Sequence, residues 1–389
     1  MKKILAITAL LLCVVLLFSS CSSGLSTESI GNVVTSISEA LFPEPTEPLN
    51  ENYNGRQNYY YSSLDEEGKI EYTKIYNAYM NYENCKLRLT ESELEDMFNC
   101  VLYDNPEIFW VDSTYSYTRY ASGTLVEPDY RNTPEESKEI TDKVTTAVAK
   151  KVAEAAGIQS DYGKEKFFHD YICINTVYDL TTYEASGDAA YSVFIDGKSI
   201  CEGYSRAMKM LLDGAGIYNY LVVGNTENED GTIDGHMWNV VSIEGELYHL
   251  DVTWDDNDGE YGDNGYLSFN ITDEDIRKDH FDIVPYDNNC TSKTYNYYNV
   301  NGTFFNSFNG FNSLVVPCAR NVTKDLVVEM RFANDGDYAN LKNRIENDNG
   351  FFDFVSDVIR TSGIKVRKDE VQYIYEDEFN YLCIIFLKG

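Results

Sequence analysis

The sequence predicts an α+β protein in which a cysteine at the start of a helix packs on an antiparallel sheet, with small α+β domains on either side. Two observations predict this core. The segment after Cys201 has one apolar face at helical spacing, made by Ala207, Met208, Leu211, Leu212 and Ala215. Two strand-like segments, 235–241 and 247–256, flank a turn that contains Gly245, which indicates a hairpin.

Length and composition limit the classes of protein that remain. The chain has 389 residues, enough for two or three domains of roughly 100–200 residues each. A hydrophobic content of 43% can form real cores, which excludes a mainly disordered chain. There are 64 acidic and 31 basic residues, a formal net charge of −33, whereas nucleic-acid binding needs Lys and Arg to neutralise phosphates. We therefore expect an acidic, soluble protein without a nucleic-acid partner.

The N-terminus predicts export from the cytoplasm. Two lysines precede an apolar run over residues 4–18, which is shorter than the roughly 20 residues that a membrane-spanning helix needs. The run leads into Ser-Ser-Cys at residues 19–21, an ending that resembles a bacterial lipoprotein signal. That resemblance implies a signal peptide over residues 1–20 and a diacylated Cys21, so that the protein is lipid-anchored in the cell membrane and faces the extracytoplasmic side. The alternative is an ordinary secretory signal or an uncleaved anchor.

A tether and a first domain follow. Residues 21–52 are Ser-rich at first and then contain three prolines, which cannot lie inside a helix, so we interpret them as a lipidated linker. An N-terminal α+β domain is predicted over residues 53–130. Its expected elements are helices over 64–85 and 90–102, the second with a capping box, and a strand over 108–111.

The central and last domains are predicted over residues 131–290 and 291–389. The central domain begins with a helix signature at residues 133–136, and a second helix is expected over 163–176. In the last domain the expected elements are a strand over 327–332, a helix over 338–359, and a hairpin of strands 371–375 and 381–387.

Cys201 is the candidate nucleophile. It follows a turn at residues 196–198 and lies at or near the N-terminus of the predicted helix. Backbone N–H groups and the partial positive charge of a helix N-terminus favour a thiolate over a thiol and can also hold an oxyanion. Taken alone the signal is weak, because a single cysteine in this position is more often a buried, inert side chain.

The hairpin supplies a candidate base and a candidate carboxylate. A turn centred near Glu244 places position 236 opposite about position 252, which brings His236 close to Asp251. A thiol, an imidazole and a carboxylate are the groups needed for covalent acyl transfer: the imidazole takes the thiol proton and the carboxylate orients the ring.

At these residues the sequence resembles a known family. Cys-Glu-Gly-Tyr-Ser-Arg-Ala from Cys201, Gly-His-Met-Trp-Asn around His236 and His-Leu-Asp-Val-Thr-Trp-Asp-Asp around Asp251 are similar to the transglutaminase-like superfamily of bacterial extracellular proteins. The resemblance covers about residues 165–282, and the segment 104–111 resembles a domain that often precedes this one. It implies a papain-like α+β core with Cys201 as nucleophile, His236 as base and Asp251 as the orienting residue. Transglutaminases, proteases, deamidases and inactive members all belong to this superfamily.

The resemblance leaves two functions open. The first is a cell-surface cysteine enzyme that hydrolyses or transfers protein or peptide amides through a thioester, without a cofactor or metal. The second is a catalytically silent lipoprotein that uses the same fold to bind a polymer or a protein partner. The oligomeric state is not predicted.

The remaining histidines and acidic residues are predicted to be structural. His249 shares a strand face with Asp251 but does not meet it head-on, and His169 and His280 are interpreted as satisfied or surface side chains. The acidic segment 255–260 does not fit the EF-hand spacing and is interpreted as a solvated turn. Tyr191 is the one candidate offered for a second oxyanion donor.

The cysteines predict no metal site. Of the nine cysteines, two belong to the signal and lipidation segment, which leaves an odd number of seven. There is no Cys-x-x-Cys motif and no Cys/His cluster at metal-ligand spacing, so a structural zinc site is not expected. The sequence does not decide which of the seven form disulfides.

Overall fold

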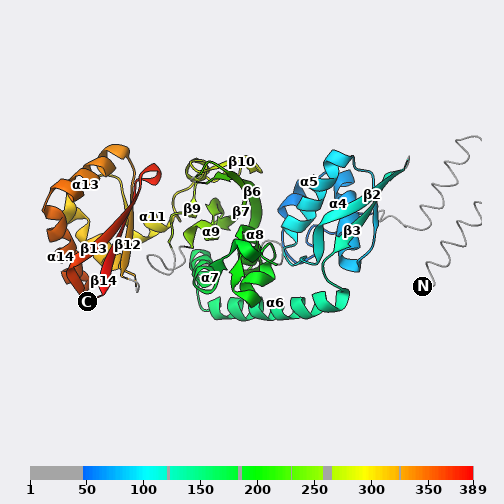
Figure 1. Ribbon diagram of the computed structural model, residues 1–389, viewed down its shortest axis with the longest axis horizontal. Coiled ribbons are helices and arrows are strands. Elements are labelled where there is room, and N and C mark those ends of the chain that lie inside the picture. The colour runs from blue at the N-terminus through cyan, green and yellow to red at the C-terminus, as the bar shows by residue number, and fades with distance from the viewer. Residues whose placement is uncertain are drawn as a thin grey trace, which may run out of the picture. The chain divides into compact units, whose positions relative to one another are not determined.

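The computed structural model of the chain describes residues 47–120, 123–182, 186–228, 230–256, 265–323 and 326–388 (Figure 1). The predicted signal peptide, Cys21 and most of the predicted tether lie outside these residues. The chain divides into two compact units, of which the first contains Asp65–Met97 and Ser113–Asp129 and the second contains Asn50–Leu64, Phe98–Asp112 and the chain from Tyr130 onward. Within the described ranges, no helix has both the length and the apolar character needed to cross a membrane.

The first unit combines a helix with a three-stranded sheet. Helix α4 (Glu66–Asn81) begins at Asp65, whose side chain accepts a hydrogen bond from the Gly68 amide. The sheet order is β1-β3-β2, with antiparallel pairing of β1 with β3, and the bounds are β1 Cys85–Leu87, β2 Val111–Tyr120 and β3 Gly123–Tyr130. Helix α5 (Glu91–Asp104) begins in this unit at the predicted capping box. Both predicted helices are present, but the strand begins at Val111 and not at residue 108.

Two short segments of the second unit are tied together by one carboxylate. The side chain of Asp104 accepts hydrogen bonds from the backbone amides of Tyr60 and Tyr61, at the start of helix α3 (Tyr59–Ser63). The Tyr60 hydroxyl donates to the carbonyl of Leu221 in the central sheet, at 2.8 Å. These bonds attach residues 59–63 and 104 to the unit that contains Cys201.

Helices precede the central sheet, as the sequence predicts. Helix α6 (Pro134–Ala155) begins with the capping box of Thr133 and Glu136, and α7 (Asp161–Asn175) begins at Ser160. Short strands β4 (Val177–Tyr178) and β5 (Lys198–Ser199) then pair in parallel. Between them lie two short helical turns, η1 (Leu180–Thr182) and η2 (Ser192–Asp196).

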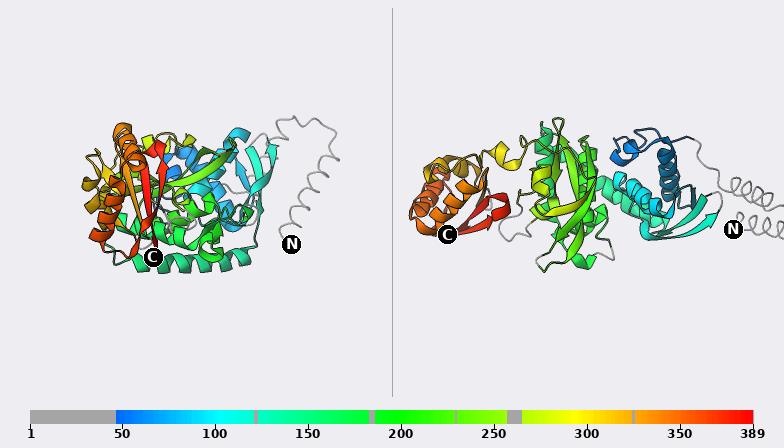
Figure 2. Two further views of the ribbon diagram at one scale, coloured as in Figure 1. Left: turned by 60° about the vertical axis from the view of Figure 1, so that its left-hand side comes forward. Right: turned by 90° about the horizontal axis from the view of Figure 1, so that it is seen from above.

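A five-stranded antiparallel sheet forms the centre of the second unit, with the order β10-β6-β7-β8-β9. Its long strands β6 and β7 run side by side in both views of Figure 2. Helix α8 (Cys201–Gly214) packs on β6 and β7. The strand bounds are β6 Asn219–Glu227, β7 Ile233–Ile243, β8 Glu246–Leu250, β9 Phe269–Ile271 and β10 His280–Val284. The predicted cysteine helix on an antiparallel sheet is confirmed.

The hairpin between β7 and β8 has a two-residue turn. Glu244 and Gly245 both have positive φ, at 52° and 84°, as a type I′ turn requires. Ile243 pairs with Glu246, and Val240 pairs with His249. The turn therefore lies within one residue of the predicted centre, and this register sets the neighbours of every residue on the two strands.

The core of the unit forms where α8 meets the sheet. Tyr204, Met208 and Leu211 project from α8 and are fully buried against sheet residues that include Val241 and Tyr248. Burying a side chain of this size contributes about 1.5–3 kcal/mol. This packing holds the first turn of α8, and with it Cys201, against the sheet.

The C-terminal part of the second unit has a four-stranded sheet in the order β11-β12-β14-β13. The hairpin of β13 and β14 is confirmed, with Glu376 paired to Tyr381. The predicted helix over 338–359 is wrong as a single helix, because the chain breaks at Asp348, whose carboxylate accepts from the Gly350 amide. The bounds are β11 Phe304–Phe305, β12 Val327–Phe332, β13 Val366–Glu376, β14 Tyr381–Lys388, α11 Tyr297–Asn301, α12 Val315–Asn321, α13 Asp335–Asn347 and α14 Gly350–Ser362.

Candidate active site

Cys201 is the first residue of α8. The preceding residue, Ile200, has extended backbone angles and caps the helix, so the chain turns into the helix at the cysteine itself. The side chain of Cys201 is 4% exposed. The predicted position at a helix N-terminus is therefore confirmed.

Polar side chains fix the first turns of α8 to strand β7. The Ser205 hydroxyl lies 2.7 Å from the carbonyl oxygens of both Cys201 and Met237. Asn239 of β7 donates to the carbonyl of Ser205, at 3.0 Å. All of these groups are buried, so each bond satisfies a polar atom that water cannot reach. These hydrogen bonds explain why Ser205 occurs in the motif that begins at Cys201 and why Asn239 occurs in the motif around His236.

Gly203 allows α8 to approach the turn that precedes it. A methyl group at this position would overlap the Ser199 hydroxyl and the carbonyl oxygen of Gly187. The Ser199 hydroxyl is itself bonded to that carbonyl and to Ser192, so it has little room to move. A glycine two residues after the cysteine is thus required by close packing.

His236 and Asp251 form a buried pair. The Nε2 atom of His236, in β7, lies 2.6 Å from Oδ2 of Asp251. His236 is 8% exposed and Asp251 is fully buried. With Nε2 directed to the carboxylate, the lone pair on Nδ1 is the one available to accept a proton from a thiol.

Asp251 is held by the backbone that follows it. The predicted strand over 247–256 is wrong after Leu250, because Asp251 caps a short helix, α9 (Val252–Asp255). Its Oδ1 accepts hydrogen bonds from the amides of Thr253 and Trp254, while Oδ2 faces His236. Burial alone raises the pKa of Asp251, but His236 and His280 outweigh it and hold the pKa well below its usual range.

The thiol of Cys201 is bonded to a carboxylate. Its Sγ atom lies 3.0 Å from Oε2 of Glu202, the next residue of α8. Burial raises the pKa of Cys201, and the negative charge of Glu202 raises it further, whereas a hydrogen bond from the Met237 amide has the opposite effect. Burial and Glu202 thus oppose the effect that is expected of the helix N-terminus. The Met237 amide nevertheless places Sγ beside the residue that follows His236.

His280 lies next to the pair, which the sequence does not predict. Its Nε2 is 3.3 Å from Oδ2 of Asp251, and its Nδ1 is 2.6 Å from Oδ1 of Asp279. Burial alone lowers the pKa of His280, but the carboxylates of Asp251 and Asp279 outweigh it and raise the pKa to about 9. The ring is 1% exposed and lies against Trp238 and Trp254. His280 is thus buried and not a surface histidine.

The other two histidines are fully satisfied, as predicted. In His249, Nδ1 accepts from the indole N–H of Trp238 and Nε2 is 2.9 Å from Asp273. In His169, the two ring nitrogens lie 3.1 Å from Asp170 and 3.2 Å from Asp255. All of these nitrogens are paired and both rings are fully buried, so neither histidine can serve as the base.

Asp255 departs from its predicted role in a solvated turn. It is 1% exposed, and its oxygens contact His169 and the amide of Ser268. Burial raises the pKa of Asp255 to about 6. Residues 257–260 of the same predicted turn lie outside the described residues.

Tyr178 contacts the site electrostatically, and Tyr191 does not. Burial raises the pKa of Tyr178, and the negative charge of Glu202 raises it further, as an ionised Cys201 would. The ring of Tyr191 packs edge-on against Phe109, with centroids 5.0 Å apart. Tyr178 is therefore the better candidate for a second oxyanion donor. Tyr178 lies on the short strand β4, and its spacing from Cys201 in the sequence does not indicate that the two residues are close.

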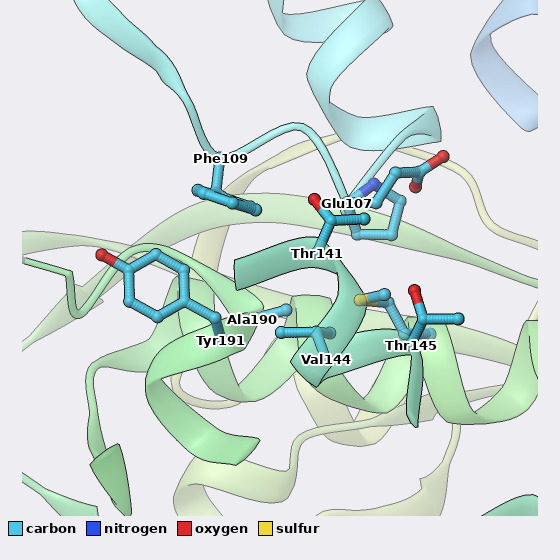
Figure 3. A pocket seen from close by; sticks show the side chains of 9 residues that line it. Glu107, Phe109, Thr141, Val144, Thr145, Ala190 and Tyr191 are labelled. Carbon is cyan, nitrogen blue, oxygen red and sulfur yellow. The ribbon is translucent and has the colours of Figure 1, made fainter. Parts of the chain in front are cut away.

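A pocket of about 250 Å³ lies away from this site (Figure 3). Its walls are largely apolar, and neither Cys201, His236 nor Asp251 is among them. The lining residues are Pro106, Glu107, Phe109, Thr141, Val144, Thr145, Ala190, Tyr191 and Met210. Glu107 is already paired with Arg56, at 2.8 Å, so the pocket presents no free charge for a ligand.

Every described cysteine is a free thiol. The seven are Cys85, Cys100, Cys173, Cys201, Cys290, Cys318 and Cys383. Burial raises the pKa of Cys85 to about 12 and that of Cys173 to about 11. The thiols of Cys85 and Cys173 are thus protonated at neutral pH.

The sequence is similar to a known superfamily over the region of this site. Residues 146–252 match the sequence profile of the transglutaminase-like superfamily, so this part of the chain is a domain of that superfamily. The matched residues include Cys201, His236 and Asp251. Among curated proteins, no sequence matches the chain.

Three solved structures have similar parts. One is a TGase, with 17% identity and a TM-score of 0.26, where the match covers 44% of this chain and 50% of that chain. The second is a protein from Cytophaga hutchinsonii assigned as a cysteine protease, with 13% identity, a TM-score of 0.23, and coverage of 36% and 61%. The third, from Parabacteroides distasonis, is assigned as a protease, with 9% identity, a TM-score of 0.23, and coverage of 36% and 35%. The chain thus spans half the length of the TGase that it matches.

Proposed function

Because residues 146–252 form a transglutaminase-like domain, we propose that the protein is a cysteine-dependent enzyme acting on protein or peptide amides. The contact that carries the proposal is the 2.6 Å pair of His236 and Asp251. His236 precedes Met237, whose amide donates a hydrogen bond to the thiol of Cys201 at the start of α8. A buried carboxylate that orients an imidazole beside a cysteine is the arrangement that covalent acyl transfer requires.

The chemistry proceeds in two steps. His236 takes the thiol proton on Nδ1 while Sγ of Cys201 attacks the amide carbon, and the backbone N–H of Cys201 donates to the oxyanion. The C–N bond then breaks, the leaving amine takes the proton from Nδ1, and a thioester remains. Water or a second amine attacks that thioester and loses a proton to His236. The C–S bond then breaks, the acyl group leaves as an acid or a new amide, and the proton on Nδ1 returns to Sγ of Cys201. Asp251 keeps Nε2–H oriented and stabilises the imidazolium.

Export and lipid anchoring are part of the same proposal. The residues that support them are the apolar run over 4–18 and Cys21, which belong to the sequence alone. A diacylated Cys21 has two chains, and two chains give stable attachment where one gives only marginal binding. The substrate is then a protein or peptide outside the cytoplasm.

A catalytically silent binding lipoprotein is the second candidate, and one observation favours it. In the structure the thiol donates its hydrogen bond to Glu202, and burial raises the pKa of Cys201, so the cysteine is held in its unreactive form. An enzyme must overcome this when substrate binds. A binding protein has no such need.

Labelling with iodoacetamide distinguishes the two functions. For an enzyme, we expect Cys201 to be the fastest of the thiols to react, and we expect its rate to fall in His236→Ala and to fall less in Asp251→Asn. Peptide mass spectrometry assigns each label, and Cys201→Ala provides the blank. If all thiols react slowly and His236→Ala changes none of them, the binding lipoprotein is the correct function.

A further inference from the structure

Three side chains from different elements converge around Asp251. His236 lies on β7, Asp251 begins α9, and His280 begins β10 on the far side of β6 in the sheet order. No two of their ligand atoms are more than 4.8 Å apart, and all three residues are buried. The proposed mechanism uses only His236 and Asp251, so the position of His280 needs an explanation of its own.

The hydrogen bonding of His280 fixes which nitrogen faces the site. Its Nδ1 lies 2.6 Å from Asp279, so when a metal ion displaces a proton from the ring, the remaining hydrogen stays on Nδ1 and the lone pair is on Nε2. That Nε2 points toward Asp251 at 3.3 Å, is buried, and makes no hydrogen bond. A carboxylate on the far nitrogen of a histidine is the outer-shell arrangement that orients metal-ligating imidazoles.

We propose that His236, Asp251 and His280 form a zinc-binding site. Two histidines and a carboxylate are one of the ligand sets of catalytic zinc sites, with bonds of about 2.0–2.2 Å, so ligand atoms of one ion lie about 3–4 Å apart. Here Oδ2 of Asp251 lies 2.6 Å from Nε2 of His236 and 3.3 Å from Nε2 of His280, and all the ligand atoms lie within 4.8 Å of one another. The carboxylates of Asp251 and Asp279 favour a cation at this position.

Zinc at this site switches off the cysteine. A zinc ion takes the lone pair of Nε2 of His236, so the ring hydrogen moves to Nδ1 and Nδ1 can no longer accept the proton of Cys201. Asp251 also loses its contact with the ring. The inhibitory role rests on the proposed function, whereas zinc binding itself does not.

A second cluster of the same size shows why ligand distances are not enough. The ligand atoms of His249, Asp273 and Cys290 also lie within 4.8 Å of one another, and these residues are also buried. The indole N–H of Trp238, however, donates to Nδ1 of His249, which places the ring hydrogen on Nε2, the atom that faces Asp273. A zinc ion could take the lone pair of Nε2 only if the ring hydrogen moved to Nδ1, as it can in His236, but in His249 the Trp238 N–H already occupies Nδ1. The proposal is therefore confined to the cluster of His236.

Zinc affinity is measured in the full-length Cys201→Ser protein, freed of metal, by competition with a chromophoric zinc chelator. Removing the thiol excludes binding through Cys201 itself. The second variant adds His280→Asn. The Asn amide can donate a hydrogen bond to Asp279 in place of Nδ1–H, but it has no counterpart of the Nε2 ligand. The control adds His249→Gln instead. Thermal melting shows whether each variant is folded.

We expect the Cys201→Ser protein to bind one zinc ion. Adding His280→Asn should lower the zinc affinity by at least about tenfold, because the loss of even an outer-shell partner of a metal ligand lowers metal affinity by that much. The His249→Gln control keeps the affinity, and a thousandfold excess of Mg²⁺ does not compete. Equal affinity in the folded proteins with and without His280→Asn would overturn the site.

Labelling tests the inhibition separately. In the protein with Cys201 intact, we expect zinc to slow the labelling of Cys201 by iodoacetamide. In the His280→Asn variant, we expect the labelling rate to be the same with and without that concentration of zinc. If Cys201 is unreactive even without metal, the proposed enzyme fails while zinc binding in Cys201→Ser stands. If zinc slows both proteins equally, it acts through the thiol and the inhibitory role of this site is wrong.

Discussion

Glu202→Gln is expected to make Cys201 more reactive. The carboxylate of Glu202 lies 3.0 Å from Sγ, and its negative charge opposes the formation of a second negative charge on the sulfur. A glutamine has the same length, carries no charge, and can donate a hydrogen bond to the thiolate. The substitution thus removes a barrier to ionisation without creating a cavity.

The size of the effect follows from Coulomb's law. Two unit charges 3.0 Å apart interact by about 1.4 kcal/mol at the dielectric constant of water. Glu202 is half-buried, so the repulsion in the protein is at least this large. An energy of about 1.4 kcal/mol is about tenfold in the thiol–thiolate equilibrium. We expect the labelling rate of Cys201 at pH 7 to rise about tenfold or more.

The assay is the rate of iodoacetamide labelling of Cys201 between pH 6 and 10. Because the raised pKa favours the thiol, the wild-type rate should increase at higher pH than for an ordinary cysteine, and Glu202→Gln should move the increase to lower pH. Glu246→Gln removes an exposed carboxylate at the β-hairpin and serves as the control. A Glu202→Gln profile that coincides with wild type, or lies at higher pH, would refute the reasoning.

Four further predictions concern other parts of the chain. Tyr178→Phe should lower kcat/KM for an amide substrate by roughly 100-fold if its hydroxyl supports the oxyanion, and an unchanged value removes it from that role. Gly203→Ala should lower the free energy of unfolding by about 1–3 kcal/mol in urea titrations, because the methyl overlaps Ser199 and Gly187; equal stability would show that the turn relaxes freely. Burial raises the pKa of Glu165 to about 8, so the folded state holds an extra proton between about pH 5 and 8. The melting temperature should therefore fall as pH rises across this range. Glu165→Gln should make the melting temperature less dependent on pH, and an equal slope in both proteins contradicts this prediction. Cys21→Ser should release the protein into the medium or leave it unprocessed, whereas a processed variant that stays with membranes rules out lipidation at this residue.

The sequence predicts the site where local rules suffice. Apolar spacing after Cys201 places the cysteine at a helix start, and a turn with Gly245 sets the register that brings His236 toward residue 251. Both results depend only on residues near one another in the chain. The end of the strand at Leu250 was not predicted, because the pattern of residues 247–256 continues apolar and aromatic while the Asp251 side chain caps a helix.

Contacts made across the sheet were beyond this reasoning. His280 reaches Asp251 because β10 returns to the edge beside β6, and nothing in the spacing between residues 251 and 280 specifies that edge. The bond from the thiol to Glu202 joins neighbours in sequence, but it depends on the rotamer of the glutamate, which the pattern does not determine. Burial of Asp255 likewise depends on His169, which is 86 residues away.

The two histidines of the hairpin show which physical property separates a base from a structural residue. The sheet surrounds both His236 and His249 with the same partner, Trp238, whose ring stacks near His236 while its N–H donates to His249. In His249 that donation and the contact with Asp273 use both nitrogens, so the ring has no site left for a proton in transit. In His236 only Nε2 is paired, and Nδ1 remains for the thiol. Proximity to a carboxylate is common to both, so the role of each histidine follows from the partner of its second nitrogen.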